Sequence, residues 1–281
     1  MFEFLELLPI LTDPARFGAD PADAFTVVAP SLPGYGLSFT PGQARFGIEA
    51  IANCFAELMT EVLGYGRFGA QGGDWGSFIT ARLGLAYPDR LSGIHLNMLP
   101  VRRDPKMVSN PTREESRYLE ELQLWLKEET GYQWIQGTRP QTLAFALTDS
   151  PVGLASFFLD KFNEWTYSGG NAEKSLTKDE MLDDISLYWF TDTAVSSAQL
   201  YWENNNNNFN VVEQKTREIK VPVAVTVFPG EIYQAPKSWT EKAYPNLIYF
   251  NQAKKGGHFA SWEEPQVFAQ ELREAFRSLR K

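Results

Sequence analysis

Hydrophobic positions follow two patterns along the chain: short apolar runs and amphipathic spacings of about 3.6 residues. Apolar runs typical of buried strands occupy Phe25–Ala29, Tyr65–Gln71, Leu91–Met98, Val221–Phe228 and Leu247–Asn251. Helical spacing occupies Phe2–Leu11, residues 47–62, Phe78–Ala86 and Pro265–Arg280. Strands that alternate with helices in this way predict an α/β fold built on a mostly parallel sheet.

The pattern changes between residues 100 and 200, where charged and aromatic residues are frequent and no strand alternation appears. Helical spacing recurs there at Glu114–Glu128 and Leu154–Trp165. We therefore expect a helical lid, residues 100–205, inserted between an N-terminal part (1–99) and a C-terminal part (206–281) of one core. The low-complexity run Asn204–Asn208 is expected to be a solvated loop.

Composition excludes several classes of partner and site. With 26 basic and 35 acidic residues the net charge is −9, so nothing favours general binding to nucleic acid or to anionic membranes. A single cysteine, Cys54, excludes an internal disulfide, and two histidines nearly exclude a multi-histidine metal centre. No apolar run reaches the roughly 18 residues of a membrane span and no leader-peptide pattern is visible, so we expect a cytoplasmic protein. The oligomeric state is left open.

The segment Gly72-Gly-Asp-Trp-Gly-Ser77 stands between a predicted strand and a predicted helix. Glycines at 72, 73 and 76 suit the strained turn of a nucleophile elbow, which projects one side chain into a cleft at a helix N-terminus. The projected residue is Asp74, and carboxylates are known covalent nucleophiles. On these residues alone, an aspartate that merely caps the helix explains the pattern about equally well.

Two further residues follow in the order that α/β-hydrolases use, nucleophile, acid and histidine. Glu231 comes after the strand Val221–Phe228, and His258 comes after the next strand through two glycines. The competing histidine, His95, lies inside a predicted buried strand, where a hydrogen-bonded core role is the better interpretation.

At this level of detail the chain resembles the α/β-hydrolase-fold epoxide hydrolases, specifically their microsomal-like branch, over nearly all 281 residues. The motifs that carry the resemblance are Pro33-Gly-Tyr-Gly-Leu-Ser38, Gln71-Gly-Gly-Asp-Trp-Gly-Ser77, Ile94-His-Leu-Asn-Met98, Gly131-Tyr-Gln-Trp-Ile-Gln136, Ala146-Leu-Thr-Asp-Ser-Pro-Val-Gly-Leu-Ala155, Lys161-Phe-Asn-Glu-Trp165, Ser196-Ser-Ala-Gln-Leu-Tyr201 and Gly256-Gly-His-Phe-Ala260. Several of them fall in the predicted lid, where hydrolase families diverge most.

The resemblance implies a role for each candidate residue. Asp74 would be the nucleophile, His258 the base and Glu231 its orienting acid, while Tyr132 and Tyr201 would protonate the opening epoxide. The backbone N–H of Trp75 would contribute to the oxyanion hole. The partners would be a small epoxide and water, with no metal or organic cofactor.

An apolar or aryl epoxide is favoured over a small charged one, because the predicted lid is rich in aromatic side chains. These aromatics are Trp134, Phe157, Phe158, Trp165 and Trp189.

The resemblance also implies an N-terminal region that precedes the position of Met1, with early strands and a His-Gly-Xaa-Pro loop that supplies an oxyanion-hole amide. This chain contains no His-Gly-Xaa-Pro. The family's third strand would lie between the segments Phe25–Ala29 and Tyr65–Gln71, so either the chain is a fragment or its fold is altered. We expect the 281-residue chain, made alone, to aggregate and to lack useful hydrolase activity.

Two other functions stay open. A haloalkane-type dehalogenase also uses an aspartate followed by tryptophan, as in Asp74-Trp75, and would release halide. The paired tyrosines favour epoxide opening, because a departing halide needs no proton donor. A non-catalytic binding fragment would produce neither halide nor diol.

Overall fold

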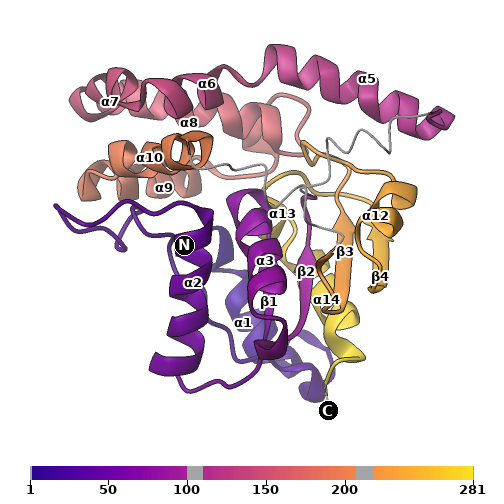
Figure 1. Ribbon diagram of the computed structural model, residues 1–281. Coiled ribbons are helices and arrows are strands. Elements are labelled where there is room, and N and C mark those ends of the chain that lie inside the picture. The colour runs from indigo at the N-terminus through magenta and orange to yellow at the C-terminus, as the bar shows by residue number, and fades with distance from the viewer. Residues whose placement is uncertain (1, 100–109, 207–217, 281) are drawn as a thin grey trace.

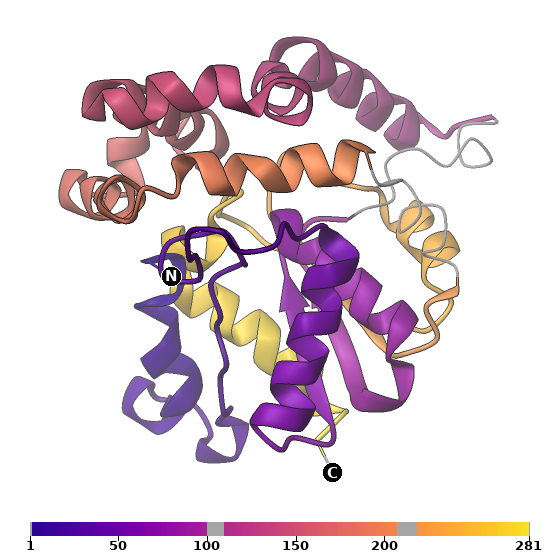
Figure 2. The ribbon, with the colours of Figure 1, turned by 60° about the vertical axis from the view of Figure 1, so that its left-hand side comes forward.

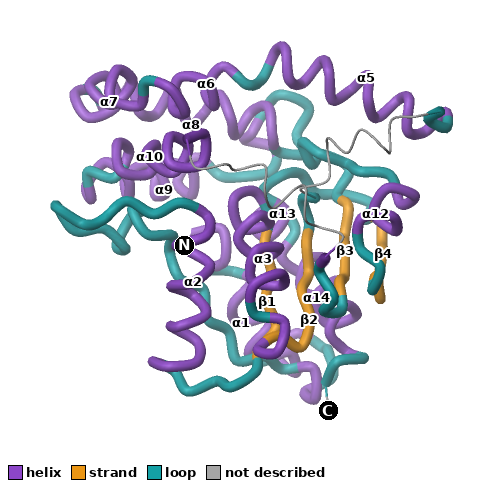
Figure 3. Tube along the Cα trace, in the orientation of Figure 1, coloured by secondary structure: helices purple, strands orange, loops and turns teal. Residues whose placement is uncertain are grey.

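The computed structural model describes residues 2–99, 110–206 and 218–280, and it contains one four-stranded sheet (Figure 3). The strands are β1 (Phe68–Gly72), β2 (Leu91–Leu96), β3 (Val223–Val227) and β4 (Leu247–Gln252). Their order in space is β1-β2-β3-β4, and each neighbouring pair is parallel. The four corresponding predictions from the sequence are confirmed in kind, with boundaries that differ by at most three residues.

Helices cover both faces of the sheet (Figure 1). α2 (Ile48–Glu57, continued by a π-helical turn, Leu58–Val62), α3 (Asp74–Ala86) and α12 (Lys237–Ala243) share one apolar core with the strands. On the other face α1 (Leu7–Thr12) and α14 (Pro265–Arg277) form a second core, next to the short α13 (Ala260–Glu263). Such a three-layer arrangement buries both faces of a parallel sheet. The remaining short 3-10 turns are Phe2–Phe4, Pro14–Phe17, Pro21–Asp23, Pro88–Arg90 and Ala172–Lys174.

Six helices of the described residues form a separate layer that lies across one end of the sheet (Figure 1). They are α5 (Arg113–Glu128), α6 (Gly131–Thr138), α7 (Pro140–Asp149), α8 (Pro151–Trp165), α9 (Lys178–Thr191) and α10 (Ala194–Asn206). Side chains of α7 to α10 build a core of their own, centred on Leu154, Phe162 and Ile185. In Figure 2, α10 runs between the other helices of the layer and the strand-containing core. We refer to these six helices as the helical layer; the boundaries 100 and 205 stay a prediction.

The predicted strand Phe25–Ala29 is wrong. These residues form no ladder with any strand of the described chain; the backbone N–H of Phe25 donates to the Leu11 carbonyl instead, at 2.9 Å. Phe25 and Val27 still pack against the core around α14, and Phe25 meets Phe276 edge to face at 6.2 Å. The apolar residues are therefore only partly buried, and partial burial does not supply the neighbouring strand that a ladder requires.

The predicted solvated loop at Asn204–Asn208 is also wrong as far as the described residues extend, because 204–206 belong to α10, while 207 and 208 lie outside them. Asn204 is buried, and its side-chain oxygen accepts the first N–H of α2, at Ile48, at 3.0 Å. An N-terminal helix N–H has no partner within its own helix. Asn204 supplies that partner and thereby ties α10 to the core.

In the described part of the chain, no single helix has the length and apolar character needed to cross a membrane. The pair α7 and α8 meets the test only jointly, and it is bent by 116° at its break.

Candidate active site

The carboxyl end of β1 runs directly into α3, and Asp74 is the first residue of that helix. Its φ of 43° lies in the left-handed region, which a non-glycine residue adopts rarely and at a cost of about 1–3 kcal/mol. The side chain is 41% exposed, so the turn presents a carboxylate to the space beneath the helical layer. This is the geometry of a nucleophile elbow.

The glycines of the elbow act differently from the sequence interpretation. The strained backbone is at Asp74 itself, whereas Gly72 and Gly73 are needed because of close approach. A Cβ on Gly72 would lie 2.0 Å from the Gly76 carbonyl oxygen, and a Cβ on Gly73 would lie 2.6 Å from the Asn97 side chain. A Cβ on Gly76 would meet nothing within 4 Å, so this glycine is not required by space.

We predict opposite effects for two alanine substitutions in this turn. Gly72→Ala should lower the free energy of unfolding by about 3 kcal/mol or more, because the new Cβ meets backbone that cannot move aside. Gly76→Ala, the matched control, should raise it by about 0.5–1 kcal/mol, because it removes a glycine from the interior of α3. Urea unfolding followed by circular dichroism measures both. Equal stability of the two variants would contradict this account of the elbow.

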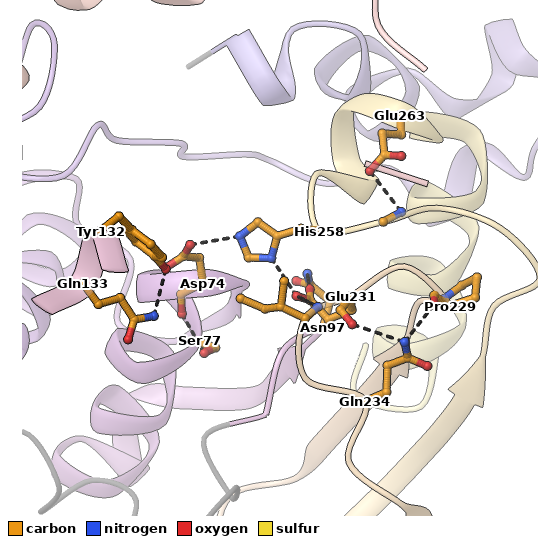
Figure 4. A network of polar contacts seen from close by, with 12 residues as sticks. Asp74, Ser77, Asn97, Tyr132, Gln133, Pro229, Glu231, Gln234, His258 and Glu263 are labelled. Carbon is orange, nitrogen blue, oxygen red and sulfur yellow. Dashed lines mark hydrogen bonds and ion pairs between the residues drawn. The ribbon is translucent and has the colours of Figure 1, made fainter. Parts of the chain in front are cut away.

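Three candidate residues that lie far apart in the sequence, Asp74, Glu231 and His258, are joined by hydrogen bonds through the His258 ring (Figure 4). His258 Nε2 lies 2.9 Å from Asp74 Oδ2, and His258 Nδ1 lies 2.6 Å from Glu231 Oε1. Glu231 is 3% exposed and follows β3, while His258 follows β4. The carboxyl ends of parallel strands share one edge of a sheet, which is why these loops converge.

Backbone contacts hold the two loops together. Gly230 N–H donates to the Gly256 carbonyl at 3.0 Å, which joins the Glu231 turn to the His258 loop. His258 N–H donates to the Trp165 carbonyl at 2.8 Å. A Cβ on Gly257 would lie 2.5 Å from that same carbonyl, so the loop fits only with glycine there.

Electrostatics in this triad favour a charged imidazole. Burial by itself lowers the pKa of His258, but the charge of Glu231 and the hydrogen bond to Asp74 outweigh it and raise that pKa well above its usual value. Burial raises the pKa of Glu231, and the charge of His258 opposes the rise. The pair therefore shares a buried positive and negative charge, with Asp74 as a second anion on the exposed side.

Both candidate tyrosines reach the site from the helical layer. Tyr132 belongs to α6 and Tyr201 to α10, with ring centroids 5.8 Å apart and edge to face. Tyr201 packs at 4.8 Å on the Trp75 indole, the neighbour of Asp74. Burial is the main cause that raises the pKa of each phenol well above its usual value, and the charge of Asp74 contributes to both. Two protonated phenols thus lie near one carboxylate.

The position of Tyr201 depends on contacts between α10 and the glycine-rich loop after residue 32. Ser196 Oγ donates to the Gly34 carbonyl at 2.6 Å, and Gly36 N–H donates to Thr193 Oγ1 at 3.1 Å. Gly34 has a φ of 94° and Gly36 one of 47°, so the loop turns in a conformation that glycine tolerates best. These contacts hold α10 against the loop, and Tyr201 on α10 packs on Trp75, the neighbour of Asp74.

The aromatic residues of the helical layer divide into three groups. Trp165 is 7% exposed and packs on the His258 ring with centroids 5.2 Å apart. Phe157, Phe158 and Trp189 pack in the internal core of the layer. Trp134 is 66% exposed, so its expected part in an apolar site is wrong. Its helical neighbour Tyr132 occupies the inward direction instead.

The other histidine has a structural environment. His95 is fully buried in β2, its Nε2 lies 3.0 Å from Thr226 Oγ1, and burial lowers its pKa to about 3. A neutral, buried histidine of this kind has the environment of a structural core residue. Trp75 stands in the first turn of α3, where backbone N–H groups are not used within the helix, and its role as an oxyanion donor stays a prediction.

Sequence reasoning missed three polar residues around the triad. Asn97 follows β2, accepts from Gln71 Nε2 at 2.8 Å and lies 3.5 Å from Glu231 Oε2. Glu263 accepts the N–H groups of Gly257 at 3.0 Å and Tyr167 at 2.6 Å, which links the His258 loop to the end of α8. Gln133 contacts the Tyr132 phenol. Position after a parallel strand could have indicated Asn97; nothing local indicates the other two.

Metal-binding geometry is not found within residues 2–99, 110–206 and 218–280: no group of three or more histidine, cysteine, aspartate or glutamate side chains could hold an ion there.

The family model described as the alpha/beta hydrolase fold matches residues 14–265. The chain belongs to that family. The parallel sheet flanked by helices, which the sequence predicted, is therefore confirmed as an α/β-hydrolase fold.

Named relatives of this α/β-hydrolase extend the resemblance along the whole chain. It is 48% identical over 280 residues to a putative epoxide hydrolase of Stigmatella aurantiaca, and 36% identical over 292 residues to epoxide hydrolase 1 of Sus scrofa. The alignments cover 100% and 97% of this chain but only 62% and 64% of those proteins. The chain thus spans less than two thirds of the length of these curated relatives.

The crystal structure of juvenile hormone epoxide hydrolase from the silkworm Bombyx mori superposes with a TM-score of 0.88 at 30% identity. That superposition covers 99% of this chain and 69% of the silkworm chain. The resemblance to epoxide hydrolases expected from the motifs is confirmed in sequence and in structure.

Proposed function

We propose that this α/β-hydrolase is an epoxide hydrolase that opens an apolar epoxide to a vicinal diol through an ester on Asp74. One arrangement carries the proposal. The Asp74 carboxylate lies beside His258, which is hydrogen-bonded to Glu231, and the phenols of Tyr132 and Tyr201 pack next to each other in the same site. A carboxylate attacks carbon, while paired phenols stabilise an oxygen that is gaining negative charge.

In the first step an Asp74 oxygen attacks one epoxide carbon and the bond from that carbon to the epoxide oxygen breaks. The freed oxygen takes a proton from Tyr132 or Tyr201, and the resulting phenolate regains its proton from solvent. Because burial strongly disfavours a lasting phenolate, the phenols act chiefly as hydrogen-bond donors that complete proton transfer late.

In the second step His258 Nε2 takes a proton from water, and the hydroxide oxygen attacks the ester carbonyl of Asp74. Ester formation has by then neutralised Asp74, so one of the causes that raises the pKa of His258 is gone. The imidazole can therefore give up its proton and act as a base, while Glu231 at 2.6 Å holds its orientation. Collapse of the intermediate breaks the bond between the carbonyl carbon and the diol oxygen, the protonated His258 returns its proton to that oxygen, and the diol leaves as Asp74 regains its carboxylate.

Single turnover in heavy-oxygen water tests this scheme. With styrene oxide as substrate and enzyme in excess, the solvent label should appear in Asp74 and not in the first diol, because the second diol oxygen comes from the carboxylate. Mass spectrometry of the peptide that contains Asp74 measures the label. Label found first in the diol would contradict an aspartyl ester.

The assay is run on this chain alone and on the chain preceded by the N-terminal region that the family resemblance implies. Diol from the longer form only would support the expectation that the shorter chain is inactive. A haloalkane is the matched substrate: release of halide at a rate comparable with epoxide opening would favour a dehalogenase and contradict the proposal.

A further inference from the structure

Tyr132 has a hydrogen-bond partner that nothing in the resemblance assigns. Gln133, the next residue of α6, donates from its Nε2 to the Tyr132 phenolic oxygen at 2.8 Å (Figure 4). Consecutive helical residues point about 100° apart, so this bond forms only at the far ends of two long side chains.

We propose that Gln133 is a positioning residue that directs the Tyr132 proton toward the substrate oxygen, an inference that rests on the proposed epoxide opening. A phenol carries one proton and can also accept hydrogen bonds. Because the amide N–H of Gln133 occupies an acceptor site on the Tyr132 oxygen, the phenol is not donating to Gln133. Its proton stays available for another acceptor in the site.

The same bond also favours the reaction electrostatically. Burial, Tyr201 and Asp74 all raise the pKa of Tyr132, and the hydrogen bond from Gln133 is the cause that opposes them. As the epoxide oxygen draws the phenol proton, negative charge accumulates on the phenol oxygen. A donor already 2.8 Å away strengthens its bond as that charge grows, so it stabilises the transition state more than the ground state.

Two neighbours of the phenols, Lys161 and Trp75, also favour negative charge on the phenol oxygens. Lys161 Nζ lies over the Tyr132 ring at 5.4 Å and is held there by Glu129 at 3.0 Å. The Trp75 indole packs edge to face on Tyr201 with ring centroids 4.8 Å apart, and the Trp75 side chain lowers the pKa of Tyr201 against the larger effect of burial.

Binding of a neutral amide tests the proposal without any turnover. The carbonyl oxygen of hexanamide can accept both phenol protons, as the epoxide oxygen would, and tryptophan fluorescence reports binding. Gln133→Leu should weaken hexanamide binding roughly three- to tenfold, the usual effect of losing one neutral hydrogen bond. Gln133→Glu should weaken it at least as much, because a carboxylate accepts the Tyr132 proton.

A double-mutant cycle separates positioning from folding. In a Tyr132→Phe background Gln133→Leu should have no further effect, since the proposed action passes through the phenol. Gln141→Leu, the same change at an exposed residue of α7, should leave binding unaltered. Equal losses with and without the Tyr132 hydroxyl would mean that Gln133 acts on the fold, and they would overturn the proposal.

The direction in which Gln133→Leu changes the affinity for hexanamide is equally decisive. If the phenol in fact donated to the amide oxygen, Gln133→Leu would free its proton and tighten hexanamide binding, which would also overturn the proposal. In single turnover, Gln133→Leu should slow ester formation by a similar factor and leave ester hydrolysis unchanged. If no epoxide is opened by any form, the proposed function fails, while the amide measurements still decide the role of Gln133.

Discussion

In the longer form, which carries the N-terminal region that the resemblance implies, replacing His258 with glutamine should leave the protein covalently loaded with its substrate. His258 acts after ester formation in the proposed scheme, so Asp74 can still attack but the ester cannot be hydrolysed efficiently. Turnover should fall by roughly 10²–10⁴-fold, the usual contribution of a general base. Intact-mass spectrometry after addition of styrene oxide should show the mass of the protein plus one epoxide.

The second histidine provides the matched control. His95→Gln removes the only other histidine of the chain from a buried site beside Thr226, so we expect lower stability but no trapped ester. A His258→Gln variant that turns over at the original rate would exclude His258 as the base. A trapped ester in His95→Gln alone would assign the second step to His95.

The pH dependence of ester hydrolysis follows from the same residues. In the free protein the hydrogen bond to Asp74 helps to raise the pKa of His258, and in the ester that anion is absent. The rate of ester hydrolysis should rise with pH through a lower pKa than the one that NMR titration finds for His258 in the free protein. Equal values would mean that Asp74 does not influence the base.

The elbow and the order of the triad could be predicted because their signals are local. A strand, two glycines and an aspartate at a helix start fix the direction of one side chain, as the φ of 43° at Asp74 illustrates. Glu231 and His258 each follow a parallel strand, and the carboxyl ends of such strands meet at one edge. Three short segments therefore indicated Asp74, Glu231 and His258 as candidates, and the family resemblance was needed to assign a role to each.

The two tyrosines could be named only from the family resemblance. The chain has 11 tyrosines, and no local pattern distinguishes Tyr132 or Tyr201 from those that merely pack. Their selection depends on how α6 and α10 cross above the sheet, which is decided by contacts such as Ser196 with Gly34. Gln133 and Glu263 were missed for the same reason, because each acts through a partner whose direction only the fold defines.

Two errors show where pattern and structure separate. Phe25–Ala29 has the composition of a strand and is partly buried as a strand would be, yet no described strand pairs with it. The asparagine run suggests a loop by composition, but Asn204 is buried and caps α2 through a bond to Ile48. A hydrophobic run indicates that a segment is at least partly buried, and a low-complexity run indicates only a biased composition. Neither pattern shows which group a backbone N–H or C=O will bond to.

The largest loss of activity is expected for Asp74→Asn. This change keeps the size of the side chain and a residue type that tolerates positive φ, so the elbow should fold, but it removes the anionic nucleophile. Ester formation should fall by at least about 10⁴-fold, as for other covalent nucleophiles, and no adduct should appear even in the His258→Gln background.

The matched control is Asp192→Asn, because Asp192 is exposed and has a φ of 54° at the end of α9. It should alter neither step. Intact mass must first show that the amide at position 74 is retained, since hydrolysis would restore the aspartate. Adduct formation at the original rate in a retained Asp74→Asn protein would assign the nucleophile elsewhere and would leave the strained turn without a chemical role.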